Sequence, residues 1–289
     1  MATLNDQLDA EGYPVAAPRQ YYQWRGHRIA YYTAGTGAPL LLIHSINAAA
    51  SAFEMRRPFA ALREQYQVYA LEFLGYGGSD RPAIRYDAGL YAALISDFTH
   101  DVIGSGVPAI ASSLSSAYLV RAAAAAPRLF GPLVLICPTG IRDLAQPNEP
   151  GWGYDLLRSP FGDLIFRGLS SRSSIAFFLR RQSYFDPASV DELTIEGFYR
   201  AAFQAGAKYA PICFLTGLLN CDINDDIGRL QQPVQLIWGR ETTITPLSRA
   251  DGFLKRNPRA RLDIVERARL SLQDERPTEF VALVRSFLA

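Results

Sequence analysis

Histidine and cysteine are scarce in this sequence, and each scarcity limits the chemistry that the chain can perform. The 289 residues contain three Cys, namely Cys137, Cys213 and Cys221, and three His. The cysteines are widely spaced and form no CxxC pair, so they indicate neither a zinc site nor a disulfide framework, and we expect no metal. An odd number of thiols suits a reducing compartment, so we expect a cytoplasmic protein.

The chain also lacks a charge bias and a long apolar run. Its 29 Lys and Arg residues nearly balance 28 Asp and Glu residues, which gives a formal net charge of +1. Because a surface that binds polyanions normally has a basic excess, we expect no nucleic acid partner. The first twenty residues hold no apolar signal-peptide core, and the longest uncharged stretch, Ala34 to Phe53, contains glycine, proline and polar residues. We therefore expect neither a signal peptide nor a transmembrane segment.

What the sequence does contain is the composition of a folded domain, with 49% hydrophobic and 20% charged residues. Its length suits one large domain or a domain with an insertion. Two aromatic runs, Tyr21–Trp24 and Arg28–Tyr32, flank an Arg-Gly-His tip and predict a hairpin. The apolar run Pro39–Ile43 is too short for a helix and fits a strand that is buried on both faces of a sheet.

Strand patterns and helix patterns then alternate along the first half of the chain. Strands are predicted at Tyr66–Leu71, Pro108–Ala111 and Leu133–Ile136, and helices at Phe59–Glu64, Tyr91–Ile103 and Leu119–Ala126. Near the end, strands are predicted at Pro233–Gly239 and Arg261–Val265, and a helix at Pro277–Leu288. This alternation, without internal repeats, predicts the α/β class with a doubly wound, mostly parallel sheet.

The alternation is interrupted over residues 141–230, where the chain looks helical and is rich in Phe, Tyr, Leu and Arg. A segment of this length is too long for an ordinary loop and is typical of a lid. Its aromatic side chains, such as Trp152, Phe177 and Phe198, would form an apolar roof. The predicted organisation is an N-terminal arm over residues 1–19, a core over residues 20–140 and 231–289, and a helical lid over residues 141–230.

The site of chemistry is expected where the strand Pro108–Ala111 leads into a serine-rich turn and then a helix. Ser113 would lie at the apex of this turn, which is the geometry of a nucleophile elbow. The strained turn needs small residues two positions away on either side, and Ala111 and Ser115 are small although neither is glycine. Ser113 is therefore the candidate nucleophile, and the alternative is that these serines simply cap the helix.

Five segments, in the same order along the chain, resemble the α/β-hydrolase family. Besides the elbow at Ser113, they are Leu41–Ser45, where the family has a strand ending in His-Gly; Leu71–Pro82, which is similar to its Gly-x-Gly-x-Ser-Asp-x-Pro turn; Val234–Gly239 with Thr245-Pro246, which is similar to the strand and loop that carry the acid; and Glu275-Arg276-Pro277, which is similar to the segment after the catalytic His. The resemblance covers about residues 20–140 and 231–289. It implies a serine ester hydrolase-like branch, with backbone N–H groups of Ile46 and Leu114 forming an oxyanion hole.

Two positions depart from the family pattern, in which the nucleophile is followed by the acid and then the base. The same motifs place Thr242 at the acid position and Leu270 at the histidine position, and no His follows Ser113 anywhere in the chain. A serine hydroxyl is a weak nucleophile unless a neighbouring base takes its proton. Removing the His from a working triad costs about a millionfold in turnover. We therefore do not expect ordinary Ser-His-Asp hydrolysis.

Other residues offer weaker substitutes for the missing groups. His44 should lie at the carboxyl edge of the sheet near Ser113, where it could act as a base, although holding the oxyanion loop through local hydrogen bonds is the alternative role. Asp143 lies where some family members place an alternative acid. Ser45, Asn47 and Ser112 would give the pocket polar groups that suit anchoring a ligand or stabilising an oxyanion.

These features leave three functions open. The first is binding, or transformation without hydrolysis, of a small apolar or amphiphilic molecule under the lid. The second is ester or thioester hydrolysis by Ser113 with His44 as a non-standard base, and the third is a non-catalytic interaction protein. We expect no cofactor in any of these cases, and the identity of the ligand and the oligomeric state stay open at this point.

Overall fold

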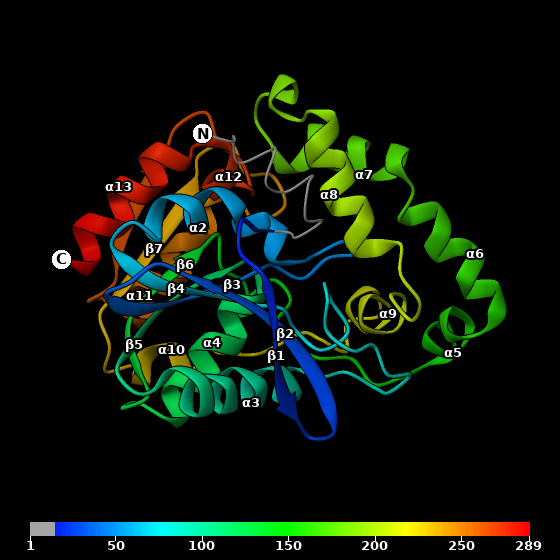
Figure 1. Cartoon of the computed structure of the whole chain (residues 1–289), viewed down its shortest axis with the longest axis horizontal. Helices are drawn as coiled ribbons and strands as arrows, with labels where there is room; N and C mark the ends of the chain where they lie inside the picture. Colours follow the sequence, from blue (N-terminus) through cyan, green and yellow to red (C-terminus); the bar gives the residue numbers. More distant parts are fainter. Residues whose placement is uncertain (1–14) are drawn as a thin grey trace.

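The computed structural model in Figure 1 describes residues 15–289, and a sheet of eight strands runs through it in the order β1-β2-β4-β3-β5-β6-β7-β8. The strands are β1 (Arg19–Trp24), β2 (His27–Ala34), β3 (Ala38–Ile43), β4 (Tyr66–Leu71), β5 (Val107–Ser112), β6 (Phe130–Ile136), β7 (Val234–Gly239) and β8 (Arg261–Val265). The pairs β1–β2 and β2–β4 are antiparallel, and all other neighbours are parallel. The expected α/β fold with a mostly parallel sheet is therefore confirmed. Most of the predicted N-terminal arm lies outside the described residues.

The central strands are apolar because helices cover both faces of the sheet (Figure 1). One face carries α2 (Arg56–Leu62), α12 (Leu272–Glu275) and α13 (Pro277–Leu288), and the other carries α3 (Ala88–Phe98), α4 (Leu114–Ala125) and α10 (Asp226–Arg229). A further helix, α11 (Ala250–Arg256), packs against α10. Residues 40–43 of β3 are all buried, as a strand without a solvent-facing side requires.

Helix starts follow local capping more closely than the apolar pattern indicated. The predicted helix from Leu119 begins five residues earlier, at Leu114, because the turn at Ser113 leads straight into it. The predicted helix from Tyr91 begins at Ala88, since the Asp87 side chain accepts a hydrogen bond from the Leu90 N–H at 2.8 Å. Hydrophobic periodicity reports neither the turn at Ser113 nor the side-chain cap at Asp87.

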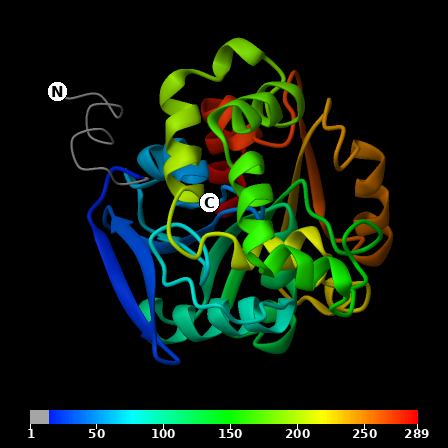
Figure 2. The ribbon, with the colours of Figure 1, turned by 90° about the vertical axis from the view of Figure 1, so that its right-hand side faces the viewer.

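Five helices follow β6 and precede α10 and β7 in the stretch that we name the helical segment (residues 141–230). They are α5 (Trp152–Arg158), α6 (Pro160–Leu169), α7 (Arg172–Phe178), α8 (Glu192–Ala202) and α9 (Tyr209–Leu215). Figure 2 views the molecule from the side of this segment, whose helices lie in front of the sheet. Ile175, Leu179 and Phe198 form an apolar cluster that also contains Phe53 from the core. The helical segment is therefore attached to the core by packing as well as by its two chain connections.

No helix in the described part of the chain is long and apolar enough to cross a membrane.

Candidate functional site

A cavity of about 800 Å³ lies between the carboxyl ends of the strands and the helical segment. In a sheet of this kind, ligands bind in the crevice outside the carboxyl ends of the strands. Most of the lining is apolar and comes from both parts of the chain, with Ile46 and Leu270 from the core and Phe178, Phe198 and Phe214 from the helical segment. Six of the core residues singled out from the sequence line this one cavity, namely Ser45, Ile46, Asn47, Ser112, Ser113 and Leu270.

Ser113 occupies a strained backbone conformation at the junction of β5 and α4. Its φ of 55° and ψ of −127° lie in a region that residues with a side chain rarely adopt, at a cost of about 1–3 kcal/mol. The turn is fixed because the Ser113 N–H donates to the Ile136 carbonyl at 2.8 Å and the Ser116 hydroxyl donates to the Ala111 carbonyl at 2.9 Å. The Ser113 side chain does not cap α4. The geometry is that of an elbow rather than of a simple helix cap.

Two backbone donors lie next to this elbow, that of Ile46 in the loop after β3 and that of Leu114 at the first position of α4. The strands β3 and β5 are neighbours, with Ile43 opposite Ala111, so the loops that follow them meet at the same edge of the sheet. Within residues 15–289, the N–H groups of Ile46 and Leu114 donate to no other protein group. Unused donors beside a serine elbow match the arrangement that stabilises negative charge on an oxygen.

His44 is held by the backbone and has no ring nitrogen left for Ser113. Its Nε2 accepts a hydrogen bond from the Phe73 N–H at 3.2 Å, so the proton is on Nδ1, which donates to the Ser45 carbonyl at 2.6 Å. The ring is fully buried, and this burial lowers its pKa to about 4. The structure therefore argues against His44 as a base and favours its alternative role of fixing the loop.

The expected acid and base positions hold side chains that cannot transfer a proton at neutral pH. Leu270 lines the cavity together with Ser113, and Thr242 is buried with its Oγ1 at 3.8 Å from the Cys137 Sγ. Burial also raises the pKa of the Cys137 thiol to about 11. Among the described residues, no side chain forms a hydrogen bond with the Ser113 hydroxyl, and no histidine lines the cavity.

Glu54 is a cavity residue that the sequence reasoning missed. It is buried, its Oε2 accepts from the Ser45 N–H at 3.0 Å, and its Oε1 accepts from the Ser45 hydroxyl at 2.9 Å and the Asn47 Nδ2 at 3.0 Å. Burial raises the pKa of Glu54. Ser45 and Asn47 do line the cavity as expected, but these polar groups bind Glu54 instead of standing free for a ligand. The available signal was a lone carboxylate within the largely apolar stretch Ala48–Met55.

A buried ionic network joins the helical segment to the core. The Arg56 guanidinium contacts the Asp274 carboxylate at 2.8 Å and the Thr194 hydroxyl at 3.1 Å, and the Tyr184 hydroxyl donates to Asp274. The side chains of Arg56 and Asp274 are 3% and 1% exposed. Because Asp274 supplies the counter-charge, the network is internally compensated.

A strap of four residues, Ser183–Asp186, also fastens the helical segment to the loop around α12. The Ser271 N–H donates to the Ser183 carbonyl at 2.9 Å, and the two hydroxyls of these serines are 2.6 Å apart. The backbone N–H groups of Phe185 and Asp186 donate to the Glu275 carboxylate at 2.8 and 2.7 Å. These hydrogen bonds therefore fix the loop that carries Leu270 to the helical segment.

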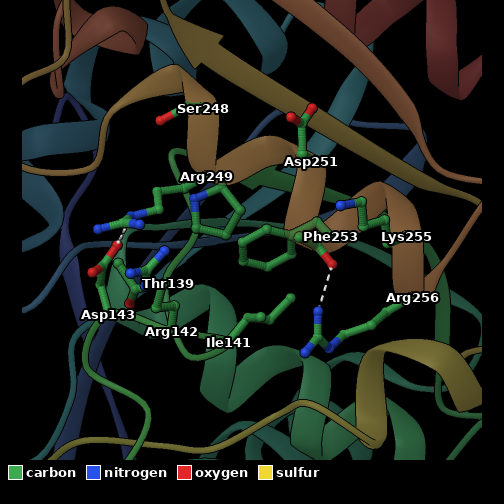
Figure 3. Close-up of a pocket in the computed structure, with 12 residues that line it drawn as sticks. Thr139, Ile141, Arg142, Asp143, Ser248, Arg249, Asp251, Phe253, Lys255 and Arg256 are labelled. Carbon is green, nitrogen blue, oxygen red and sulfur yellow. Dashed lines mark hydrogen bonds and ion pairs between the residues drawn. The ribbon is translucent and has the colours of Figure 1, made fainter.

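A second pocket, of about 400 Å³, adjoins the first and shares Thr139 and Asp143 with it. Figure 3 shows the Asp143 carboxylate joined to the Arg249 guanidinium, with an Nε to Oδ2 distance of 2.6 Å. Arg142 and Lys255 also line this second pocket. The carboxylate at the alternative acid position is therefore neutralised by an arginine and not by a histidine.

The described residues contain no group of three His, Cys, Asp or Glu side chains that could hold a metal ion. Cys137, Cys213 and Cys221 are all free and buried. Burial is the main cause of a raised pKa at each thiol, so none is set up as a thiolate.

Comparison with known proteins places these features in context. The model of the family described as "Alpha/beta hydrolase family" matches residues 40–283. The chain is 24% identical over 290 residues to an uncharacterized protein of Mycobacterium tuberculosis, with 95% of this chain and 82% of that protein covered. It is 23% identical over 234 residues to a 2-hydroxy-6-oxo-6-(2'-aminophenyl)hexa-2,4-dienoic acid hydrolase of Metapseudomonas resinovorans, with 79% and 76% covered.

Solved structures show the same fold. A serine hydrolase involved in carbazole degradation superposes with a TM-score of 0.80 at 20% identity, with 94% of this chain and 99% of that chain covered. The meta-cleavage product hydrolase CumD from Pseudomonas fluorescens IP01 gives a TM-score of 0.74 at 21% identity, with 93% and 97% covered.

Proposed function

Because this chain belongs to the alpha/beta hydrolase family, we propose that it is a member with an incomplete triad that binds a small apolar molecule, or transforms one without hydrolysis. The observation that carries the proposal is the Ser113 hydroxyl, which lines the cavity and forms no hydrogen bond with any described side chain that could act as its base. Without a base, the hydroxyl stays a poor nucleophile at neutral pH. Ordinary ester turnover should therefore be very low.

The cavity has the dimensions and the lining of a ligand site. Sites for small molecules commonly measure ~300–1,000 Å³ and combine an apolar wall with a few placed polar groups. The apolar wall here includes Phe178 and Phe198 from the helical segment, which would act as a lid over the ligand. The unused N–H groups of Ile46 and Leu114 would stabilise a ligand oxygen that carries partial negative charge.

The strained elbow supports a second candidate function, slow ester or thioester hydrolysis by Ser113. Several relatives are named as hydrolases, and a non-glycine residue with φ of 55° is commonly associated with a functional site. This candidate would need a base other than His44. A non-catalytic interaction protein is supported less well, because a purely structural chain has no need of such a cavity.

A serine-directed fluorophosphonate probe, combined with nitrophenyl ester assays, tests the proposal. We expect slow labelling and an ester turnover no higher than that of the Ser113→Ala variant. Rapid labelling of the parent chain, together with turnover that disappears in Ser113→Ala, would establish the second candidate and overturn the first.

Binding is measured separately with the neutral fluorescent probe N-phenyl-1-naphthylamine. We expect the probe to bind the parent chain and to lose most of its affinity for Leu270→Trp, because the larger ring fills the cavity. Leu164→Trp is the matched control, since Leu164 is 68% exposed on the helical segment and does not line the cavity. Equal binding to both variants would show that the probe lies elsewhere and would contradict the proposal.

A further inference from the structure

The charges around the cavity are all of one sign. Among the described residues that line it, the ionisable side chains are Glu54 and Asp143, and there is no lysine, arginine or histidine. The Arg249 guanidinium neutralises Asp143 through their contact of 2.6 Å. Glu54 is therefore the carboxyl group that a bound ligand would meet without a compensating cation.

Three hydrogen bonds hold the Glu54 carboxyl group in place on the cavity wall. Its two carboxyl oxygens are held by the Ser45 N–H, the Ser45 hydroxyl and the Asn47 amide, which are all neutral donors. Arg56, two residues along the chain, is matched by Asp274 at 2.8 Å and forms no ion pair with Glu54. Asp274 itself adds to the negative potential at Glu54 and helps to raise the pKa of Glu54, after the larger contribution from burial.

Gln273 lies on the same wall of the cavity, and its amide oxygen has no hydrogen-bond partner among the described residues. Helix α12, which contains Gln273, packs against the turn Ala52–Met55 that contains Glu54. Gln273 lines the cavity, is only 1% exposed, and its Oε1 receives no hydrogen bond from any described residue. A buried amide oxygen without a partner is costly, so a ligand that supplies a hydrogen-bond donor would be favoured there.

We propose that Glu54 and Gln273 form a specificity subsite, which selects an uncharged apolar ligand with a hydroxyl group and rejects carboxylates. A hydroxyl can donate to the Gln273 Oε1 or to a Glu54 carboxyl oxygen, whereas a carboxylate offers only acceptors and adds a second negative charge. Next to Glu54, that charge would leave water without gaining a lysine, arginine or histidine partner among the described lining residues. The selected class differs from the dienoic acid for which one relative is named. This inference rests on the proposed function, because it assumes that the cavity binds a ligand.

Displacement of N-phenyl-1-naphthylamine from the full-length chain at pH 7.5 by three ligands of similar length tests the inference. The ligands are decan-1-ol, its ether analogue 1-methoxynonane, and decanoate. We expect decan-1-ol to displace the probe at concentrations about tenfold lower than either of the others, which is the scale of one satisfied hydrogen bond in a buried site.

Three variants assign the selectivity to side chains. Gln273→Leu should reduce the preference for the alcohol over the ether to about twofold or less, and Glu54→Gln should bring decanoate to within a few-fold of the alcohol. Arg142→Gln, on the wall of the second pocket, is the matched control and should leave all three ligands unchanged. Thermal melts verify that each variant is folded. If Gln273→Leu is unfolded, a Gln273→Met variant, which keeps the length of the side chain but removes the amide, replaces it with the same expected result.

The outcomes separate this inference from the proposed function. If the probe does not bind the parent chain, both proposals fail. If the probe binds and decanoate displaces it as well as decan-1-ol does, the cavity is a ligand site and only the selectivity is overturned. Decanoate binding that is tightest and is lost in Arg142→Gln would also overturn it, by placing the charged end of the ligand in the second pocket.

Discussion

The two sides of the cavity differ in which parts of a catalytic site they contain. On the side of β3 and β5, the Ser113 turn is strained, the Ile46 and Leu114 N–H groups are unused, and His44 fixes the loop. On the side of β7 and β8, Thr242 and Leu270 lie where the sequence motifs predict the acid and the base, above strands that pair in a parallel register. The first side is defined by backbone geometry and the second by two side chains.

This difference shows how separable the parts of such a site are. The elbow and the neighbouring N–H groups are fixed by strand pairing and by bonds such as that from the Ser113 N–H to the Ile136 carbonyl, so they persist as long as the sheet folds. The acid and base each depend on one side chain at the end of a loop, where substitution costs the fold little. Disrupting the elbow would therefore destabilise the fold, whereas replacing the acid or the base side chain would cost the fold little.

The strongest test restores the second side. The double variant Thr242→Asp and Leu270→His should gain esterase activity by about 10²- to 10⁴-fold, which is the usual contribution of a positioned general base. Initial rates with nitrophenyl butyrate measure the gain. The control pair Thr242→Asn and Leu270→Gln adds polar groups of similar size without a base and should gain nothing. A folded double variant without any gain would show that the assigned positions are wrong.

The loop around α12 is structurally essential even though it carries no base. Asp274→Asn leaves the Arg56 charge buried without its partner, so we expect the free energy of unfolding to fall by about 3–5 kcal/mol. Urea denaturation measures the loss. Asp143→Asn removes the pair with Arg249, whose side chains are 32% and 31% exposed, and serves as the comparison, with an expected loss below about 1 kcal/mol. Equal losses in the two variants would contradict the role of burial.

Protonation of His44, on the side of β3 and β5, should lower the free energy of unfolding of the chain in acid. Its folded pKa is about 4, below the ordinary value of 6.5, so the unfolded chain binds the proton more tightly. The contribution of neutral His44 to the free energy of unfolding is fully present above pH 6.5. It falls by roughly 3 kcal/mol as the pH drops to 4 and is constant at lower pH. Unfolding free energies of the parent and of His44→Gln, compared from pH 7.5 to 4, measure the difference, and parallel curves would contradict it.

The smallest expected effect concerns the strain at the elbow. Ser113→Gly should stabilise the fold by about 1 kcal/mol, because relief of the left-handed conformation outweighs the flexibility of glycine in the unfolded chain. Chemical denaturation measures the gain. Ser112→Gly, one residue earlier in regular strand geometry, should lose a similar amount. A loss in both variants would show that the Ser113 turn stores no strain.

Most of the fold could be predicted from the sequence, for reasons that particular elements illustrate. The strand Arg261–Val265 and the helix Pro277–Leu288 have the bounds that were predicted, since a turn and a proline mark them clearly. The short helix α12 was not predicted, because four residues give no periodic signal. Family membership was also predicted correctly, because its motifs are local and lie in a fixed order.

The site was less accessible to prediction than the fold. The absence of histidine after Ser113 is visible in the sequence, but the burial of Glu54 and the pairing of Asp274 with Arg56 depend on contacts between distant segments. Ser45 and Asn47 could be placed at the cavity from their position after β3, yet the direction of their polar groups depended on Glu54. The lid boundaries and the assigned acid and base positions stay predictions.

The strap Ser183–Asp186 has a mechanical consequence. Its backbone is hydrogen-bonded to Ser271 and Glu275. The strap therefore holds the middle of the helical segment against the loop that carries Leu270. Outward movement of α7 or α8, the helices that flank the strap in the chain, would therefore require these hydrogen bonds to break.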